Sequence, residues 1–413
     1  MTGTIIKKEI LGNLVSYKFY VVILLSAVLI ATSFFVMARD FKGRLADYQL
    51  IKPAPGAPIA VLPPNPLSIF AKGLEESLTR SFEVQSIGTD VRAGQASGNV
   101  IFSFFPTPDF IYIIKVVLSL VALLFGFDAV SREKEAGTLK LTLSNAVSRS
   151  AVLLGKWAGN FLSLAVPFLL VTGLGLAVMS FDADLRLSAD GLGRFAFILA
   201  GALVYIALFL SLGLLISSLV RRSATSLIVL LLVWSVIVFV LPNLGTLLAR
   251  QFVDVPSVKS LSEKRQQIWT REVLLSYGER GGWDDRIKAI HEEYTRLEED
   301  YRLKFDRLVR LSRSINRISP AASFVDAATE IAGTGIGEET RLKAEVVRYE
   351  NQVLPELIRD RRETPNAPAF SYRARRLGEV LADGGLIDLA WLAVFNIFLF
   401  AAGYVAFIRT DPR

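Results

Sequence analysis

The stretch Phe125–Trp157, FGFDAVSREKEAGTLKLTLSNAVSRSAVLLGKW, separates two long apolar runs of the chain. Gly137 and Asn145 are residues that commonly end helices, so they divide the stretch into short helical pieces. A charged, broken segment between two apolar runs predicts a loop at a membrane surface. The charged residues of this loop are Arg132, Glu133, Lys134, Glu135, Lys140 and Arg149.

Composition restricts the chain to one broad class. Of its 413 residues, 52% are hydrophobic, the formal net charge is +7, and the mean hydropathy is +0.44. These values are typical of a membrane protein with several spans. The sequence has no Cys, one His and three Met, so it offers no disulfide and no thiolate metal site, and we expect no metal or other cofactor bound by this chain.

Six apolar runs are long enough to cross a bilayer as helices of about 20 residues. An alternative interpretation of the first run is a secretory signal peptide, because Val36-Met37-Ala38 resembles a cleavage site. The apolar run is longer than that of a typical signal peptide, which favours a membrane span. Before it, residues 1–18 place Ile6, Ile10 and Leu14 on one helical face, which predicts an interfacial helix. The predicted spans are 19–38, 110–130, 157–181, 195–220, 224–249 and 389–408.

Charge on the short loops predicts the orientation. Lysines precede the first span, cations follow the second span in the 131–156 loop, Arg221 and Arg222 separate the fourth and fifth spans, and Arg409 opens the tail 409–413. The opposite connection, Phe181–Arg194, is acidic. The positive-inside rule therefore places both termini and the 131–156 loop in the cytoplasm. The predicted fold class is an all-α polytopic membrane protein with both termini inside.

Two larger regions then lie outside the membrane. Residues 39–109 contain clustered prolines, which favour extended, turn-rich backbone over a regular helix and predict a loop or small subdomain. The clustered prolines of 39–109 are Pro53, Pro55, Pro58, Pro63, Pro64 and Pro66. The second region, residues 250–388, is predicted to be mainly helical.

The 250–388 region contains an apolar seam with steps of three and four residues. A shorter stripe within Glu338–Arg362 is predicted to pack against it as an antiparallel helix, and Ser257–Tyr277 offers a third helix. Two interpretations remain open: the seam closes a private core, or it binds a periplasmic partner or substrate. His291, beside the seam, is predicted to be a surface residue. The seam residues considered for partner binding are Ile287, Ile290, Tyr294, Leu297, Tyr301, Leu308 and Leu311.

The loop's pattern S-x-E-x-E-x-G-T-L, followed by L-S-x-x-x-S-R-x-x-x-L-L-G-K, resembles the cytoplasmic coupling loop of ABC-2 type transporter permeases, in the subgroup with large extracytoplasmic loops. The family's usual proline near Ala146 or Val147 is absent here. A helix from Ser131 would place Ala136, Leu139 and Leu143 on one face, suited to docking a partner or to anchoring in lipid. The resemblance implies coupling roles for Ser131, Glu133, Glu135, Gly137, Thr138, Leu139, Ser144, Arg149 and Lys156.

The resemblance further implies an exporter subunit in the cytoplasmic (inner) membrane of a prokaryote. Its expected partners are two copies of a separate ATPase, which would hold ATP and Mg²⁺, a second permease chain, identical or related, and the lipid bilayer. An alternative function is a non-transporting complex that transmits ATPase motion to a periplasmic protein. The resemblance also implies that the helix between Ser319 and Gly333 touches or dips into the outer leaflet, and we expect an interfacial helix there.

The sequence contains no motif for catalysis. The Gly155-Lys156 pair is followed by Trp157 and begins an apolar run, so it is not a phosphate-binding loop. The sequence offers no Ser/His/Asp set, because the single histidine, His291, stands alone in a charged helix. We therefore expect that this chain is not an enzyme, that ATP hydrolysis belongs to another subunit, and that no nucleic acid is a partner. The sequence does not specify the transported substrate.

Overall fold

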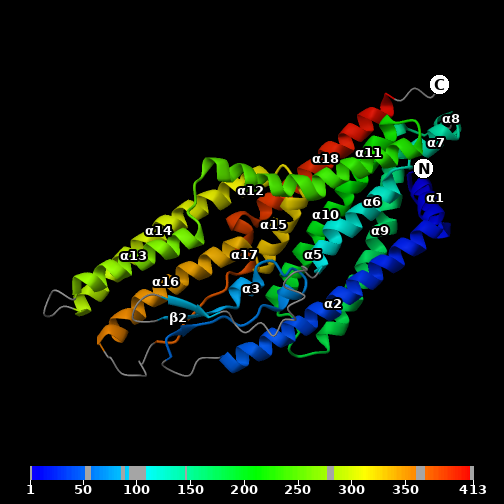
Figure 1. Cartoon of the computed structure of the whole chain (residues 1–413). Coiled ribbons are helices and arrows are strands. Elements are labelled where there is room, and N and C mark those ends of the chain that lie inside the picture. The colour runs from blue at the N-terminus through cyan, green and yellow to red at the C-terminus, as the bar shows by residue number, and fades with distance from the viewer. Residues whose placement is uncertain are drawn as a thin grey trace.

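The computed structural model describes residues 2–51, 57–84, 89–92, 108–144, 147–276, 283–359 and 368–409, and helices dominate these ranges (Figure 1). Six of the described helical segments are long and apolar enough to cross a membrane. The predicted all-α fold with six spans is thereby confirmed. The segments are Tyr17–Ile51, Phe110–Glu135, Arg149–Ser180, Ala189–Leu219, Ser223–Phe252 and Leu377–Ile408.

Two helices form the N-terminal region. Helix α1, Thr2–Val15, ends before Ser16, and α2, Tyr17–Ile51, follows in a different direction (Figure 1). The apolar run of α2 was predicted to end at Ala38, and residues from 39 onward were assigned to an irregular loop, but the helix continues to Ile51. The chain has no proline before Pro53, and Asp40 forms an ion pair with Arg44 at helical spacing, which supports the extension.

The rest of the first outer region is small and contains the only strands among the described residues. Strands β1 (Ile59–Ala60), β2 (Ser81–Val84) and β3 (Thr89–Arg92) form an antiparallel sheet in the order β1-β2-β3. A 3-10 helix at Pro66–Ile69 (η1) and α3 at Glu75–Leu78 connect β1 to β2. Proline-rich sequence thus produces extended backbone here, as predicted, although Pro53 and Pro55 fall outside the described residues.

Helix α10, Ala189–Leu219, lies at the centre of the bundle and buries most of its side chains. It packs against the second span, which runs through α5 (Phe110–Tyr112), the π-helix η2 (Ile113–Leu118) and α6 (Ser119–Gly126). A Cβ atom on Gly213 of α10 would lie 2.9 Å from the Cα atom of Gly126, so only glycines permit this close approach. Helix α9, Arg149–Ser180, flanks the pair.

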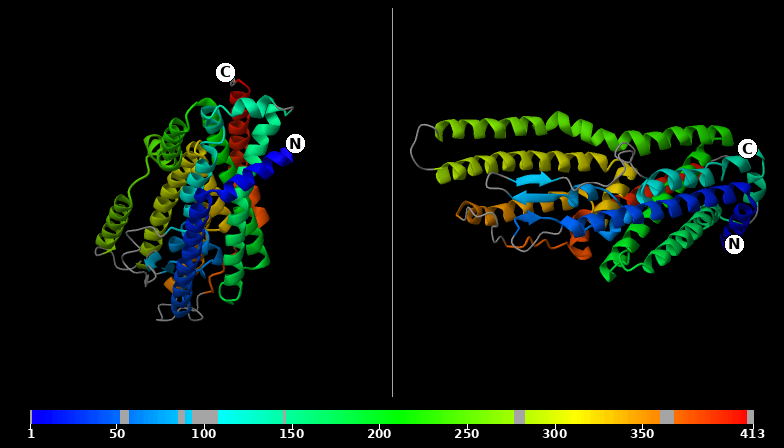
Figure 2. Two further views of the ribbon diagram at one scale, coloured as in Figure 1. Left: turned by 90° about the vertical axis from the view of Figure 1, so that its right-hand side faces the viewer. Right: turned by 60° about the horizontal axis from the view of Figure 1, so that its bottom comes forward.

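The fifth span bends and leads into a projecting hairpin. Helix α11 (Ser223–Ser235) passes through the π-helix η3 (Val236–Val240) into α12 (Leu241–Phe252), which has Pro242 in its first turn. Helices α13 (Val258–Ser276) and α14 (Trp283–Asn316) then run out and back beyond the bundle (Figure 2). The predicted third outer helix is therefore present as α13, although the chain between it and α14 lies outside the described residues.

The two apolar stripes predicted to pack against each other have different partners in the structure. The apolar stripe of α16, Ile336–Arg359, packs on the small sheet, where Leu342, Val346 and Tyr349 meet Phe82. Helix α14 packs mainly on α12 and α13, and it meets α16 through side chains such as His291, which contacts Asn351. Periodicity identified both apolar faces correctly, but it carries no information about which face meets which.

Helix α15, Pro320–Ala332, begins and ends as predicted, because the Ser319 hydroxyl accepts a hydrogen bond from the Ala322 amide and Gly333 adopts φ = 77°. Its environment differs from the expected interfacial one: most of its side chains are buried between α10 and α18, and Phe324 stacks on Tyr205 with ring centroids 4.7 Å apart. Small alanines make this burial between two helices possible.

The last span begins with α17 (Leu377–Val380) and the π-helix η4 (Leu381–Gly385) and continues as α18 (Leu386–Ile408). Both chain ends, together with the short helices α7 (Ser131–Glu135) and α8 (Leu139–Ser144), gather at one end of the bundle (Figure 1). We name this the terminal end, and the opposite end, with α13, α14 and the sheet, the far end. Of the predicted tail, residues 410–413 lie outside the described residues.

Candidate functional site

The loop that follows the second span folds as an elbow of two short helices, α7 and α8, at the terminal end. Gly137 lies between them with φ = 70°, a conformation that favours glycine. The single amphipathic helix expected from Ser131 is therefore wrong: α7 ends at Glu135, Ala136 is exposed, and Leu139 begins α8. The predicted break at Asn145 lies outside the described residues, and the side chain of Leu143 is likewise not described.

Ser131 anchors the elbow to the end of α10. Its side chain is fully buried, and the Ser217 hydroxyl accepts hydrogen bonds from the amides of Val130 and Ser131, both at 3.0 Å. Ser217 in turn donates to the Ser131 hydroxyl at 3.2 Å. Serine is small enough to sit where α7 meets α10, so these hydrogen bonds join the two helices directly.

Two neighbouring residues of α7 hold the turn between α10 and α11. The Lys134 ammonium donates to the carbonyls of Ser218 and Val220, which end α10. The Glu135 carboxylate accepts a hydrogen bond from the Ser223 amide, at the start of α11, at 3.2 Å. A cation at a helix C-terminus and an anion at a helix N-terminus both complement the helix dipoles.

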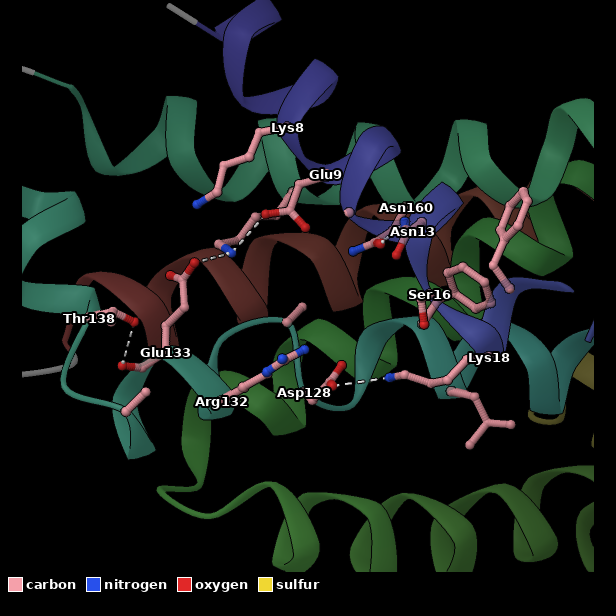
Figure 3. Close-up of a pocket in the computed structure, with 17 residues that line it drawn as sticks. Lys8, Glu9, Asn13, Ser16, Lys18, Asp128, Arg132, Glu133, Thr138 and Asn160 are labelled. Carbon is pink, nitrogen blue, oxygen red and sulfur yellow. Dashed lines mark hydrogen bonds and ion pairs between the residues drawn. The ribbon is translucent and has the colours of Figure 1, made fainter. Parts of the chain in front are cut away.

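Lys156 is the ionic centre of the elbow. Its side chain is only 4% exposed, and its ammonium lies 2.8 Å from Glu133 of α7 and 3.0 Å from Glu9 of α1 (Figure 3). Because α9 begins at Arg149 and not at the predicted residue 157, Lys156 belongs to the spanning helix itself. The triad therefore connects the interfacial helix, the elbow and the third span through one buried cation.

Apolar packing completes the elbow. Leu139 is buried with Val152 of α9, Leu214 of α10 and Phe407 of α18. Arg149 donates to the carbonyl of Ile408, and Ser148 caps α9 by accepting from the Ala151 amide at 3.2 Å. Together with the Glu135–Ser223 contact, the elbow thus touches the third, fourth, fifth and sixth spans.

The remaining predicted site residues lie on the elbow surface. Thr138 and Ser144 are exposed, and their hydroxyls donate to the backbone carbonyls of Glu133 at 3.4 Å and of Leu141 at 2.9 Å. Leu141 is 68% exposed, which is unusual for a leucine at the centre of a short helix. Sequence reasoning did not single out Leu141, Glu9 or Ser217, because their roles depend on contacts made far along the chain.

The predicted seam of α14 faces the rest of the chain. Ile287, Ile290, Tyr294 and Leu308 are buried, and Leu297, Tyr301 and Leu311 are half-buried. Leu308 packs with Ala249 of α12 and with Val253, the residue after that helix, whereas the Tyr294 hydroxyl donates to the Arg265 carbonyl of α13 at 3.0 Å. This packing favours the private-core interpretation of the seam. His291 is mostly covered and lies 3.1 Å from Asn351.

A second ion cluster, which sequence reasoning missed, lies at the far end. The Asp388 carboxylate, in the first turn of α18 and almost fully buried, pairs with Arg317 at 2.7 Å and Arg313 at 3.2 Å. Arg313 also pairs with Glu330 of α15 at 3.2 Å, and Glu330 with Arg375 at 3.4 Å. An acidic residue at the start of an otherwise apolar run was the available signal.

Comparison with known proteins gives one family. The model for the ABC-2 family of transporter proteins matches residues 4–411. The chain is 31% identical over 140 residues to the probable ABC transporter permease protein NosY of Pseudomonas aeruginosa, over 33% of this chain and 50% of that protein. It is 32% identical over 119 residues to the NosY protein of Stutzerimonas stutzeri, over 28% and 43%. The chain thus spans about half the length of these relatives.

Proposed function

Because this chain belongs to the ABC-2 family of transporter proteins, we propose that it is the membrane-spanning permease subunit of an ABC exporter. A separate cytoplasmic ATPase, present in two copies, drives it by docking on the elbow formed by α7 and α8. ATP and Mg²⁺ are held by that ATPase, and a second permease chain completes the transporter. The chain lies in the inner membrane with its terminal end in the cytoplasm.

The observation that carries this proposal is the Lys156 triad. A force applied to α7 reaches α9 through Glu133 and Lys156, and reaches α1 through Glu9, without passing through a flexible loop. The buried Ser131–Ser217 contact passes the same force to α10. Closure of two ATPase subunits therefore tilts α9 and α10 together, which is the kind of rigid-body movement that opens a path through a bundle.

The docking surface is the exposed side of the elbow. The exposed residues here are Arg132, Ala136 and Lys140, and most of the Leu141 side chain is exposed as well. A solvent-exposed leucine flanked by cations suits a groove with an apolar floor and an acidic rim on the ATPase. Anchoring in lipid is the competing role for Leu141, and it requires no ATPase.

Co-purification tests the proposal. Leu141→Asp is expected to reduce the amount of ABC ATPase retained by the chain roughly tenfold, since burying a leucine contributes about 1.5–3 kcal/mol. The matched control is Leu303→Asp on α14, where the leucine is 61% exposed at the far end of the molecule. Equal ATPase retention by the two variants overturns docking through the elbow.

Orientation has its own test, because the chain contains no native cysteine. Single variants Leu141→Cys and Leu303→Cys place one thiol at each end of the molecule. An impermeant maleimide added to intact cells is expected to label Leu303→Cys and to leave Leu141→Cys unlabelled until the membrane is opened. The opposite pattern overturns the orientation and, with it, the cytoplasmic ATPase.

A second function is favoured by the hairpin of α13 and α14. Helix α14 has 34 residues, which span about 50 Å at 1.5 Å per residue. Its C-terminal part is fixed to the fifth span, since the Gly245 amide donates to Asn316 at 3.1 Å and Thr246 contacts Ser312 at 3.1 Å. Such a lever could carry motion of α12 to an extracytoplasmic partner without transport.

Shortening the lever separates the two functions. Residues 266–292 are replaced by a short Gly-Ser linker, which keeps the Arg265–Glu298 ion pair and removes only the outer part of the hairpin. A pure transporter is expected to keep its export rate, whereas a transmission device loses binding of its outer partner. Loss of export with no change in partner binding rules out the second function.

A further inference from the structure

A hollow of about 410 Å³ opens beside the elbow, between α1, the start of α2, the end of α6, α7 and α9 (Figure 3). Its size is within the range of sites that hold small ligands or headgroups. Polar and charged side chains from α1 and α7 face one another across it. The lining includes Lys8, Asn13, Ser16, Lys18, Arg132 and Asn160.

Two of the four cations that line the hollow form no ion pair among the described residues. Lys156 is shared by Glu9 and Glu133, and Lys18 pairs with Asp128 at 3.1 Å. Lys8 and Arg132 are exposed and form no ion pair within the part of the chain that the structure describes. Four cations and three carboxylates line the hollow, which leaves a net charge of +1 (4 − 3). A single phosphodiester anion carries the complementary charge.

Apolar surface adjoins this polar hollow. Leu11 and Val15 near the end of α1, and Tyr17 and Tyr20 at the start of α2, are between 51% and 89% exposed. Side chains of this kind are stable at such exposure when acyl chains cover them, and tyrosine favours the level of lipid headgroups. Phosphate-binding cations therefore lie next to a surface suited to lipid tails.

We propose that this hollow binds the headgroup of an anionic phospholipid, with Lys8 and Arg132 contacting the phosphate and the exposed face of the α1–α2 corner contacting the acyl chains. The cations come from the interfacial helix and from the elbow, so the lipid bridges α1 to α7. This site adjoins the docking surface at Arg132 and Ala136 but includes neither Lys140 nor Leu141, and it needs no ATPase.

Lipid binding to the purified chain in detergent tests the inference. The shift in melting temperature is titrated with short-chain phosphatidylglycerol, with phosphatidylcholine of the same chain length, and with inorganic phosphate. Phosphatidylglycerol alone is expected to stabilise the chain at low concentration. Equal shifts with both lipids overturn the phosphate contact, and an equal shift with inorganic phosphate overturns the lipid as occupant.

Charge-neutral variants locate the site. Lys8→Gln with Arg132→Gln is expected to weaken phosphatidylglycerol binding roughly 30-fold, because each cation near a membrane surface contributes about 1 kcal/mol. The matched control is Lys7→Gln with Lys140→Gln, which removes the same charge from exposed positions that do not line the hollow. Equal weakening in both variants indicates non-specific attraction and overturns the site.

A third variant fills the hollow without changing its charge. Gly12 lines it, and a Cβ atom built there meets no heavy atom within 4 Å. Gly12→Leu is expected to abolish the lipid-dependent shift while leaving the lipid-free protein at least as stable, since leucine favours helix over glycine. Undiminished lipid binding by a folded Gly12→Leu protein overturns the inference.

Discussion

The two ends of the bundle hold ion triads of opposite sign. At the terminal end one cation, Lys156, serves two carboxylates, Glu9 and Glu133. At the far end one carboxylate, Asp388, serves two arginines, Arg313 and Arg317. In both, the central group is nearly fully buried and its partners are partly hydrated. Each central group also lies in the first turns of a spanning helix.

The difference between the triads is in how far they extend. The Lys156 triad stops at its two glutamates, so one cation makes its ionic connection between α1, α7 and α9. Asn13 of α1 adds uncharged hydrogen bonds to Asn160 and Ser163 of α9. The Asp388 triad continues through Arg313 to Glu330 of α15. From Glu330 the network extends to Arg375, in the 368–376 segment, and then to Glu338 of α16. A single hub suits a joint that receives force, whereas a branched network suits a rigid platform for α14.

The largest expected effect is at the hub. Lys156→Met removes the only cation that Glu9 and Glu133 share among the described residues, so two carboxylates are left close together in a poorly hydrated place. We expect a loss of about 3–5 kcal/mol in stability, the usual result of leaving buried charge unpaired. Thermal unfolding in detergent, followed by circular dichroism, measures it.

The control for the hub removes the whole triad. Lys156→Met combined with Glu9→Gln and Glu133→Gln leaves no unpaired charge, and we expect it to recover most of the lost stability. It is also expected to uncouple the elbow, so that ATPase activity continues without transport. If the triple variant is no more stable than the single one, the shape of Lys156 matters more than its charge.

A smaller effect is expected at the network. Asp388→Asn removes the shared anion, but Arg313 keeps Glu330, and the arginine side chains are 26% and 30% exposed and can be hydrated. We expect a loss of about 1–3 kcal/mol, seen as faster amide exchange in Leu308–Asn316 and the first turn of α18. Asp300→Asn is the control, because its exposed pair with Lys304 contributes little. Equal changes in both variants contradict a central role for Asp388.

Local sequence patterns predicted the features that depend on residues close together in the sequence. The six spans, the break at Gly137 and both ends of α15 follow from hydropathy, turn residues and caps. The same patterns placed the start of the third span too late, because the charged first turns of α9 were assigned to a loop.

The pairings themselves could not be predicted. Glu9 and Lys156 are 147 residues apart, and Arg317 and Asp388 are 71 apart. Their partners are chosen by how the helices pack, and periodicity does not report packing. For the same reason the stripe of α16 was assigned to α14, although it covers the sheet.

The smallest expected effect comes from another buried carboxylate, Glu75 of α3. It sharpens the comparison with Asp388 because one cation lies beside it and not two. Arg44 lies 3.3 Å from it and the Asn65 amide donates at 2.7 Å, yet burial raises the pKa of Glu75 to about 7. The folded protein therefore binds a proton that the unfolded chain releases, so stability is highest in acid and falls as pH rises through 7.

Between pH 6.5 and 8 this one group is expected to reduce the stability of the wild-type protein by about 1 kcal/mol. Glu75→Gln keeps an acceptor for the Asn65 amide and cannot titrate. The free energy of unfolding of this variant is therefore expected to change less with pH over the same interval. Glu76→Gln is the matched control, because Glu76 is exposed and its pKa is lowered by a hydrogen bond with Lys72. Identical pH profiles for wild type and Glu75→Gln would mean that the single cation Arg44 keeps Glu75 ionised across this interval.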